Sequence, residues 1–134
     1  MSFPYCISIN SSYIYEQSTD ERINQNDAAI TLAHELGHYL GLRHVFSEGG
    51  TTSMCTDTDY CKDTPSYNRS EYEQWLNNLD KQNKYQLKDL AKRYSCEKGE
   101  YEAHNIMDYA YCFYNEITLE QRKRITPYLK TIAH

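Results

Sequence analysis

The sequence predicts a mainly helical α+β fold with little β-strand, and three observations support this class. Apolar residues recur at helical spacing in four stretches, one short alternating pattern lies near the N-terminus, and residues 47–69 are rich in Gly, Thr, Ser, Asp and Pro. The chain has 134 residues, of which 40% are hydrophobic and 25% charged, as in ordinary folded domains. This length allows one domain with a modest core over residues 1–134.

Charge and hydropathy exclude two classes of protein. The formal net charge is -5, and the basic run at residues 122–124 is typical of a solvated helix face. No basic surface for nucleic acid is therefore expected. No stretch approaches the roughly 20 apolar residues of a membrane span, and none resembles the apolar part of a secretory signal. We expect neither a nucleic-acid partner nor a membrane span.

The first third of the chain is predicted to contain one strand and one helix. Residues 5–10 alternate between larger apolar side chains and small or polar ones, which is the period-two pattern of a strand. Asp27 is suited to cap the following helix, whose apolar residues recur every three or four positions up to Leu40. Gly41 is suited to end this helix.

Three further helical segments are expected after the loop region at 47–69. A Ser-x-x-Glu pattern at 70–73 and a Thr-x-x-Gln pattern at 118–121 are capping boxes, each at the start of a helix. Residues 87–94 place apolar side chains at helical spacing between these two helices. Pro127 is expected to end or kink the last helix.

The five cysteines need a reason. Cys6 stands alone near the start, whereas Cys55, Cys61, Cys96 and Cys112 follow the first third of the chain. No CxxC or zinc-finger spacing is present, so a structural zinc site built on sulfur is not predicted. The four later cysteines fit two disulfides in an oxidising compartment, and the alternative is a set of buried free thiols in a cytosolic protein.

The first helix contains the sequence HELGHYLGLRH, which begins at His34. Because a helix turns about 100° per residue, His34 and His38 lie about 40° apart on one face and can both reach one Zn²⁺ at roughly 2.1 Å. Gly41 lets the chain leave the helix sharply, so that His44 can return as a third nitrogen ligand. Glu35 lies near enough to reach a water on the metal. Three histidines leave one coordination position open, as in catalytic zinc sites.

The alternative interpretation is that these histidines merely pack on a helix. Three of the five histidines of the chain fall in this segment, and ordinary helix packing has no use for such a concentration. Packed histidines also have no need of a carboxylate such as Glu35 beside them. The pattern therefore favours a metal site.

The segment from His34 to His44 resembles the HExxHxxGxxH zinc signature of the metzincin metalloproteases. A second mark of this clan is the Met-turn, a tight loop whose methionine lies beneath the zinc ligands, and Asn-Ile-Met-Asp-Tyr at 105–109 is similar to it. The His-Val-Phe run that starts at His44, the Asp-Thr-Pro run at 63–65 and this turn together resemble the pappalysin (cytophagalysin-like) family. The resemblance covers roughly residues 27–130.

The resemblance implies a zinc-dependent endopeptidase that acts on peptides or proteins. In this family His34, His38 and His44 would bind zinc, and Glu35 would act as general base and acid. Zinc lowers the pKa of its bound water toward about 7. Glu35 would take a proton as this water attacks the peptide carbonyl and would then deliver it to the leaving amine.

The resemblance also gives roles to the residues around the turn. Met107 would form the structural floor of the site, and Asp108 would hold the turn through hydrogen bonds. Tyr109 matches the position where several metzincins place a hydroxyl near the metal, and such a phenol is worth roughly a few kcal/mol when it donates to an oxyanion. The alternative for Tyr109 is one more packed tyrosine. The strand at 5–10 matches the edge strand that holds substrate by β-augmentation, or else has no substrate role.

A calcium site is a further expectation from the same resemblance. Related proteases have an Asp four residues after a Cys and a Thr before a Pro in their calcium-binding segment, and Asp59 and Thr64 match these positions. Together with Asp57 and Asp63 they offer the hard oxygens that Ca²⁺ prefers. The alternative is a solvated acidic loop without an ion.

The cysteines also follow a pattern that the family implies. Its crossed disulfides would pair Cys55 with Cys96 and Cys61 with Cys112, although the sequence alone permits three pairings. Such bonds would staple a loop-rich C-terminal subdomain. They fit a secreted, periplasmic or cell-surface protein.

The sequence departs from the family at two places. Metzincins carry a sheet of several strands before the zinc helix, and few residues precede that helix here. We therefore expect the C-terminal portion of a catalytic domain or a minimal one, with an upper part at 1–44 and a lower subdomain at 45–134. An incomplete sheet would leave an edge that favours self-association. Residues 110–115 lack the acid that family members with a preference for Arg use, so that preference is not expected.

Two alternatives to an active peptidase remain open at this point. The first is a truncated, inactive fragment that binds zinc but has an incomplete substrate cleft. The second is a small disulfide-stapled interaction module with incidental histidines, which would bind no metal.

Overall fold

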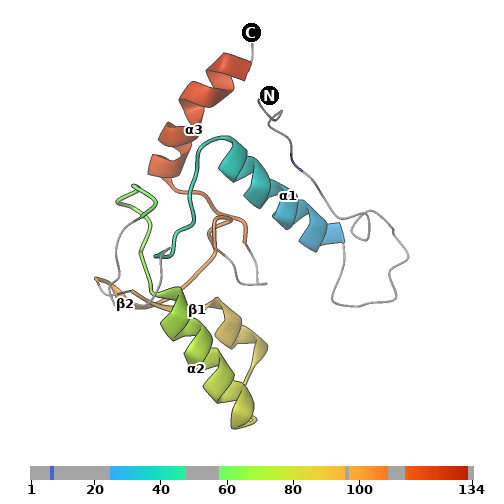
Figure 1. Cartoon of the computed structure of the whole chain (residues 1–134), viewed down its shortest axis with the longest axis vertical. Coiled ribbons are helices and arrows are strands. Elements are labelled where there is room, and N and C mark those ends of the chain that lie inside the picture. The colour runs from blue at the N-terminus through green and yellow to red at the C-terminus, as the bar shows by residue number, and fades with distance from the viewer. Residues whose placement is uncertain (1–6, 8–24, 48–57, 96, 109–113, 133–134) are drawn as a thin grey trace, which may run out of the picture.

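The computed structural model describes residues 7, 25–47, 58–95, 97–108 and 114–132 and has a small, mainly helical α+β fold (Figure 1). The predicted class is thus confirmed. The predicted strand at 5–10 lies outside the described residues except for Ile7. Along the chain the elements are α1 (Gln25–Tyr39), α2 (Arg69–Lys81), the 3₁₀ helix η2 (Leu87–Ala91), β1 (Lys92–Ser95), β2 (Gly99–Glu102) and α3 (Leu119–Ile132).

The core lies in the segments between the helices. Figure 1 shows α2 with the two strands at one end of the view and α3 with α1 toward the other, joined by extended segments. The core residues are Leu42, Val45, Phe46, Tyr67 and Met107. Each of them lies outside the described helices and strands, so the helices are held together through these connecting segments.

Two predicted helix caps are wrong. α1 begins before Asp27, which therefore lies inside the helix. α2 is capped by Asn68, whose side-chain oxygen accepts a hydrogen bond from the Glu71 N–H at 3.2 Å. Asparagine caps helices as well as serine does, and because Asn68 satisfies the free N–H groups first, Ser70 falls within the first turn.

The end of α1 is formed as the sequence predicts. Gly41 has a φ of 88°, a left-handed conformation that favours glycine. Its N–H donates to the carbonyl of His38 at 2.9 Å, and the N–H of Leu42 donates to the carbonyl of Gly37 at 2.9 Å. These two bonds form a Schellman motif. The motif turns the chain back along the helix that it has just left.

The predicted helix at 87–94 is wrong beyond Ala91. A 3₁₀ turn covers only η2, and the chain then continues as β1, in which Tyr94 is 71% exposed. β1 pairs antiparallel with β2, and its Ser95 also bridges to Tyr67 on the other side. Pairing with distant residues therefore overrides the local helical periodicity.

The start of α3 is confirmed and its end is not. The Thr118 N–H donates to Oε1 of Gln121 at 2.9 Å, and the Gln121 N–H donates to Oγ1 of Thr118 at 3.3 Å, which is the predicted capping box. Pro127 does not end the helix, which runs to Ile132. Pro127 is exposed. Solvent can therefore satisfy the carbonyl four residues earlier, which loses its hydrogen bond because proline has no N–H.

The apolar residues of α1 do not form its buried face. Leu32 and Leu36 are 37% and 42% exposed, whereas His34 and Gly37 are buried. The buried side of α1 is therefore the side that carries the predicted metal ligands.

None of the described helices combines the length and the apolar character that a membrane crossing requires.

Candidate metal centre

Three histidine side chains converge on one point. The Nε2 atom of His38 lies 3.1 Å from that of His34 and 2.9 Å from that of His44, and the His34 and His44 Nε2 atoms are 3.2 Å apart. His34 is buried, while His38 and His44 are half-buried. His34 is therefore the most buried of the three convergent residues.

The outer nitrogens of two of these rings fix their protonation. Nδ1 of His34 lies 2.7 Å from the carbonyl oxygen of Ile106, and Nδ1 of His38 lies 3.0 Å from that of Leu42. A carbonyl only accepts, so each Nδ1 carries a proton, and in its neutral form each ring turns an Nε2 lone pair inward. Two such lone pairs cannot hydrogen-bond to each other, and a cation between them removes their repulsion.

The donor set fits zinc. Within the described residues, these three histidines form the group that could hold a metal ion. Burial is the main cause that lowers the pKa of His34, which favours the neutral ligand form. Tetrahedral zinc with bonds of about 2.1 Å places its nitrogens about 3.4 Å apart, close to the observed separations.

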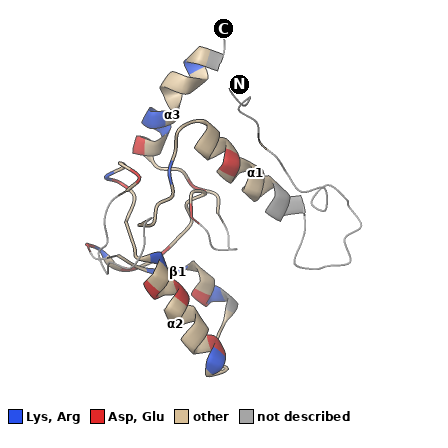
Figure 2. Cartoon of the chain, in the orientation of Figure 1, with Lys and Arg blue, Asp and Glu red and all other residues tan. Residues whose placement is uncertain are grey.

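Two further described residues lie next to the three histidines, one in contact and one in sequence. The His44 ring stacks on Phe46 with centroids 4.6 Å apart, which fixes its plane. Glu35 follows His34 directly and is half-buried. Figure 2 shows a single acidic stretch in the coloured part of α1, and Glu35 is the one acidic residue between positions 29 and 39. A carboxylate is thus present on the element that supplies two of the three histidines.

A turn formed by residues 105–108, which we call the methionine loop, packs against α1. Met107 is fully buried, and its carbonyl accepts a hydrogen bond from the Val45 N–H at 3.2 Å. A Cβ atom on Gly37 would lie 2.4 Å from the sulfur of Met107. Gly37 is thus the residue that lets the methionine loop approach the histidine side of the helix.

Replacing Gly37 by alanine is expected to lower the free energy of unfolding by about 1–3 kcal/mol, because the added methyl overlaps Met107. In a Met107→Ala background the same change should instead raise it by up to about 1 kcal/mol, since alanine favours helix. Urea unfolding of the four proteins measures both effects. The same sign in both backgrounds would show that this contact does not explain the glycine.

One end of the methionine loop is tied to α3. The side-chain oxygen of Asn105 accepts from the Met107 N–H at 3.0 Å and from Nε2 of Gln121 at 3.1 Å. The Asn105 amide in turn donates to Oε1 of Gln121 at 2.8 Å. Because the same Gln121 closes the capping box of α3, one buried side chain links the helix start to the loop.

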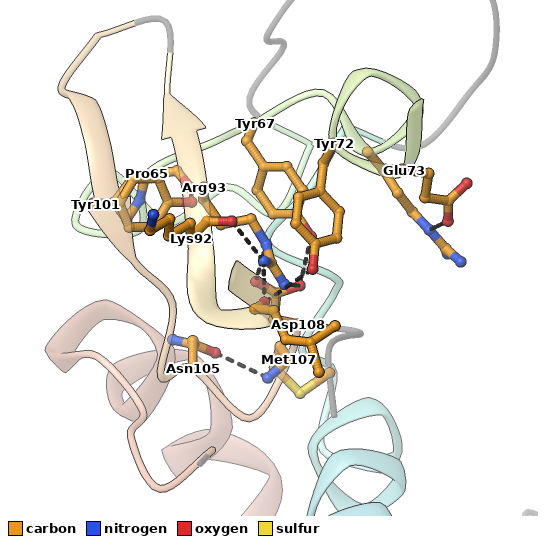
Figure 3. A network of polar contacts seen from close by, with 12 residues as sticks. Pro65, Tyr67, Tyr72, Glu73, Lys92, Arg93, Tyr101, Asn105, Met107 and Asp108 are labelled. Carbon is orange, nitrogen blue, oxygen red and sulfur yellow. Dashed lines mark hydrogen bonds and ion pairs between the residues drawn. The ribbon is translucent and has the colours of Figure 1, made fainter. Parts of the chain in front are cut away.

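The other end of the methionine loop is held by a buried ion pair. Asp108 binds Nε of Arg93 in β1 at 3.2 Å, and both side chains are fully buried. Tyr67 donates its hydroxyl to the same carboxylate, and the Arg93 guanidinium also donates to the carbonyls of Leu90 and Lys92 at 2.6 and 2.8 Å. Figure 3 shows these side chains meeting at Asp108, directly beside Met107. Burial and the Asp108 charge raise the pKa of Tyr67, which keeps it a donor.

The candidate calcium residues have protein partners in the structure. Asp59 and Thr64 are buried, and the Thr64 hydroxyl donates to Oδ2 of Asp59 at 2.7 Å. The other oxygen of Asp59 accepts from the Cys61 N–H at 2.9 Å, and Oδ2 of Asp63 accepts from the Glu120 N–H at 2.9 Å. These bonds link the residues of the loop to one another and to α3, and the calcium site stays a prediction.

Several predicted site residues lie outside the described residues. They are Tyr109, Asp57 and three of the four candidate disulfide cysteines, Cys55, Cys96 and Cys112. Cys61 is described and is buried with a free thiol. The pairing of the cysteines and the role of Tyr109 therefore stay predictions.

The Peptidase M43 family model, described as pregnancy-associated plasma protein-A, matches residues 5–130. The chain is 37% identical over 108 residues to extracellular metalloproteases of Arthroderma benhamiae and Trichophyton verrucosum, an alignment that covers 78% of this chain and 32% of each relative. The chain thus spans about a third of the length of these curated relatives. No solved structure gives a significant match.

Proposed function

Because this chain belongs to the pappalysin family of metzincin metalloproteases, the peptidase family described as pregnancy-associated plasma protein-A, we propose that it is a zinc-dependent endopeptidase. The observation that carries the proposal is the convergence of three Nε2 atoms within 3.2 Å of one another. Neutral imidazoles in this arrangement are the ligand set of catalytic zinc sites. His34, His38 and His44 would hold the ion.

The carbonyl oxygens that accept from two of the rings have a positioning role in this proposal. They belong to Ile106 in the methionine loop and to Leu42 after the helix. Outer hydrogen bonds of this kind fix the tautomer and the orientation of metal-binding histidines. The Schellman turn thus orients His38, and the methionine loop orients His34. When bound, zinc would polarise the scissile carbonyl and lower the pKa of a water molecule.

Glu35 would carry the proton. Its carboxylate accepts a proton from the attacking water as the carbon–oxygen bond forms, and it donates that proton to the nitrogen as the carbon–nitrogen bond breaks. Its place beside His34 on α1 supports this role, because a carboxylate on the ligand helix lies near the metal without needing to bind it. Tyr109, which follows the methionine loop, would donate its hydroxyl to the oxyanion. Met107 would be the structural floor of the site.

The substrate class and the cellular location follow the same reasoning. The relatives carry the name extracellular metalloprotease, and we infer secretion for this protein as well. The candidate disulfides fit an oxidising compartment. We expect peptides or unfolded proteins as substrates, with extended backbone held along a sheet edge.

A second candidate function is zinc binding without peptide hydrolysis. The observation that favours it is that the chain spans only about a third of the length of its curated relatives. A substrate cleft formed in part by residues beyond this chain would leave the three histidines in place and the peptide unheld. This candidate predicts stoichiometric zinc and negligible turnover.

Removing the metal tests the proposed function directly. Cleavage of an unstructured protein is expected to stop on treatment with a zinc chelator and to return when zinc is added back, whereas magnesium should not restore it, because imidazole ligands suit zinc. Product mass spectrometry measures the cleaved bonds. Cleavage that persists without metal would contradict the proposal. Bound zinc without any cleavage would establish the second candidate.

A further inference from the structure

A cavity of about 340 Å³ opens between α2 and the β1–β2 pair. Its size falls within the range of small-ligand pockets, about 300–1,000 Å³. Four of its nine lining residues are aromatic, and the acidic residues Glu71 and Glu100 line it as well; the aromatic residues are Tyr67, Tyr72, Trp75 and Tyr94. None of the three convergent histidines lines it, so it is separate from the candidate metal centre.

The aromatic walls already hold one cation. The guanidinium of Arg93 lies 3.8 Å from the ring centroid of Tyr72 and 5.0 Å from that of Tyr67. The Tyr72 ring in turn lies 6.2 Å from that of Trp75, which is 38% exposed. Aromatic faces attract cations through their quadrupole. The inner part of the wall is therefore occupied by a guanidinium, while Trp75 and Tyr94 present exposed aromatic surface at the solvent side.

The charged residues of the cavity that have no ion-pair partner in the described part of the chain are acidic. Its two cations are committed, because Arg93 pairs with the buried Asp108 and Lys92 lies 3.2 Å from an oxygen of Asp89. In the part of the chain that the structure describes, neither Glu71 nor Glu100 has an ion-pair partner. These two carboxylates come from different elements, α2 and β2, and both border the same cavity.

We infer that this cavity binds the basic side chain of a peptide, arginine or lysine. Its alkyl stem would pack on Trp75 and Tyr94, and its charged end would lie between the aromatic faces and the carboxylates of Glu71 and Glu100. An anionic group is disfavoured because both cations of the cavity are neutralised by partners. The inference goes beyond the proposed function, since it requires neither metal nor peptide hydrolysis.

The chain contains one tryptophan, Trp75, which lines the cavity, so fluorescence excited selectively from tryptophan reports on this site. We expect a saturable fluorescence change when N-acetyl-arginine amide is added to the full chain at low salt. The uncharged analogue N-acetyl-citrulline amide should bind about tenfold more weakly or not at all, because it lacks the cation. The double variant Glu71→Gln/Glu100→Gln should weaken the affinity for the arginine compound about three- to tenfold.

The matched control is Glu97→Gln, which removes an exposed carboxylate between β1 and β2 that does not line the cavity. It should leave the affinity unchanged. Equal affinity for the arginine and citrulline compounds would overturn the inference. So would a double variant that binds as tightly as the wild type, or a Glu97→Gln variant that weakens binding as much as the double variant does. All three substitutions are at exposed positions, and the fold should tolerate them.

Discussion

Replacing Glu35 by glutamine is expected to lower the rate of peptide hydrolysis by at least about a hundredfold, the usual contribution of a positioned acid–base group. Glutamine has nearly the same size, but its amide cannot take a proton from water. Glu35 is not among the three side chains that converge, so the variant should keep its zinc. The rate constant kcat/KM for a quenched peptide, together with zinc content by elemental analysis, measures both effects.

The control for this prediction is Glu97→Gln, which makes the same change of charge at an exposed position between β1 and β2. Its hydrolysis and zinc content should equal those of the wild type. A Glu35→Gln variant that cleaves normally would show that another group moves the proton. Loss of zinc from that variant would show that Glu35 helps to hold the metal.

Replacing Arg93 by methionine is expected to lower the free energy of unfolding by about 3–5 kcal/mol. The change leaves the Asp108 carboxylate buried without its ionic partner, although Tyr67 still donates its hydroxyl to it. Because whole domains are stable by only about 5–15 kcal/mol, this is a large share. Zinc affinity should fall with it, since the Ile106 carbonyl that orients His34 belongs to the same loop.

Two companion variants distinguish the effect of an unpaired buried charge on stability from the effect of losing a side chain. Adding Asp108→Asn to Arg93→Met should recover part of the stability, because no charge is then buried and Tyr67 keeps an oxygen acceptor. The comparison variant is Arg69→Met, whose partner Glu73 is more than half exposed and whose pair is worth less than about 1 kcal/mol. If urea unfolding shows that Arg69→Met and Arg93→Met lower the free energy of unfolding equally, the account is contradicted.

The sequence predicts the histidine segment well because its information is local. His34, His38 and Gly41 lie within one helix and its end, so the helical repeat and the left-handed conformation of glycine suffice to place them. The capping box at Thr118 and Gln121 is local in the same sense, and the structure confirms it.

The parts that the sequence does not predict depend on distant contacts. β1 was expected to continue a helix, and it becomes a strand because it pairs with β2 and bridges to Tyr67. The Arg93–Asp108 pair joins residues 15 positions apart, with no pattern in the sequence to indicate it. For the packing of the methionine loop on α1, the available signal in the sequence was Gly37, because a glycine inside a helix often has a packing reason.

The buried side of α1 shows the same limit. Helical spacing of Leu32 and Leu36 correctly predicted a helix, yet both are more than a third exposed, and the histidine side is buried. The reason lies in the methionine loop, which packs on Gly37 and accepts from His34. The helix pattern alone holds no information on which loop will cover which side.

X-ray absorption spectroscopy of the full chain loaded with zinc tests the central claim, that three histidines form the metal centre. The account predicts one zinc per chain, a nitrogen and oxygen shell at about 2.0–2.1 Å, and the outer-shell scattering of imidazole rings. A sulfur shell at about 2.3 Å would assign the metal to cysteines instead. That result, or the absence of bound zinc, would contradict the account.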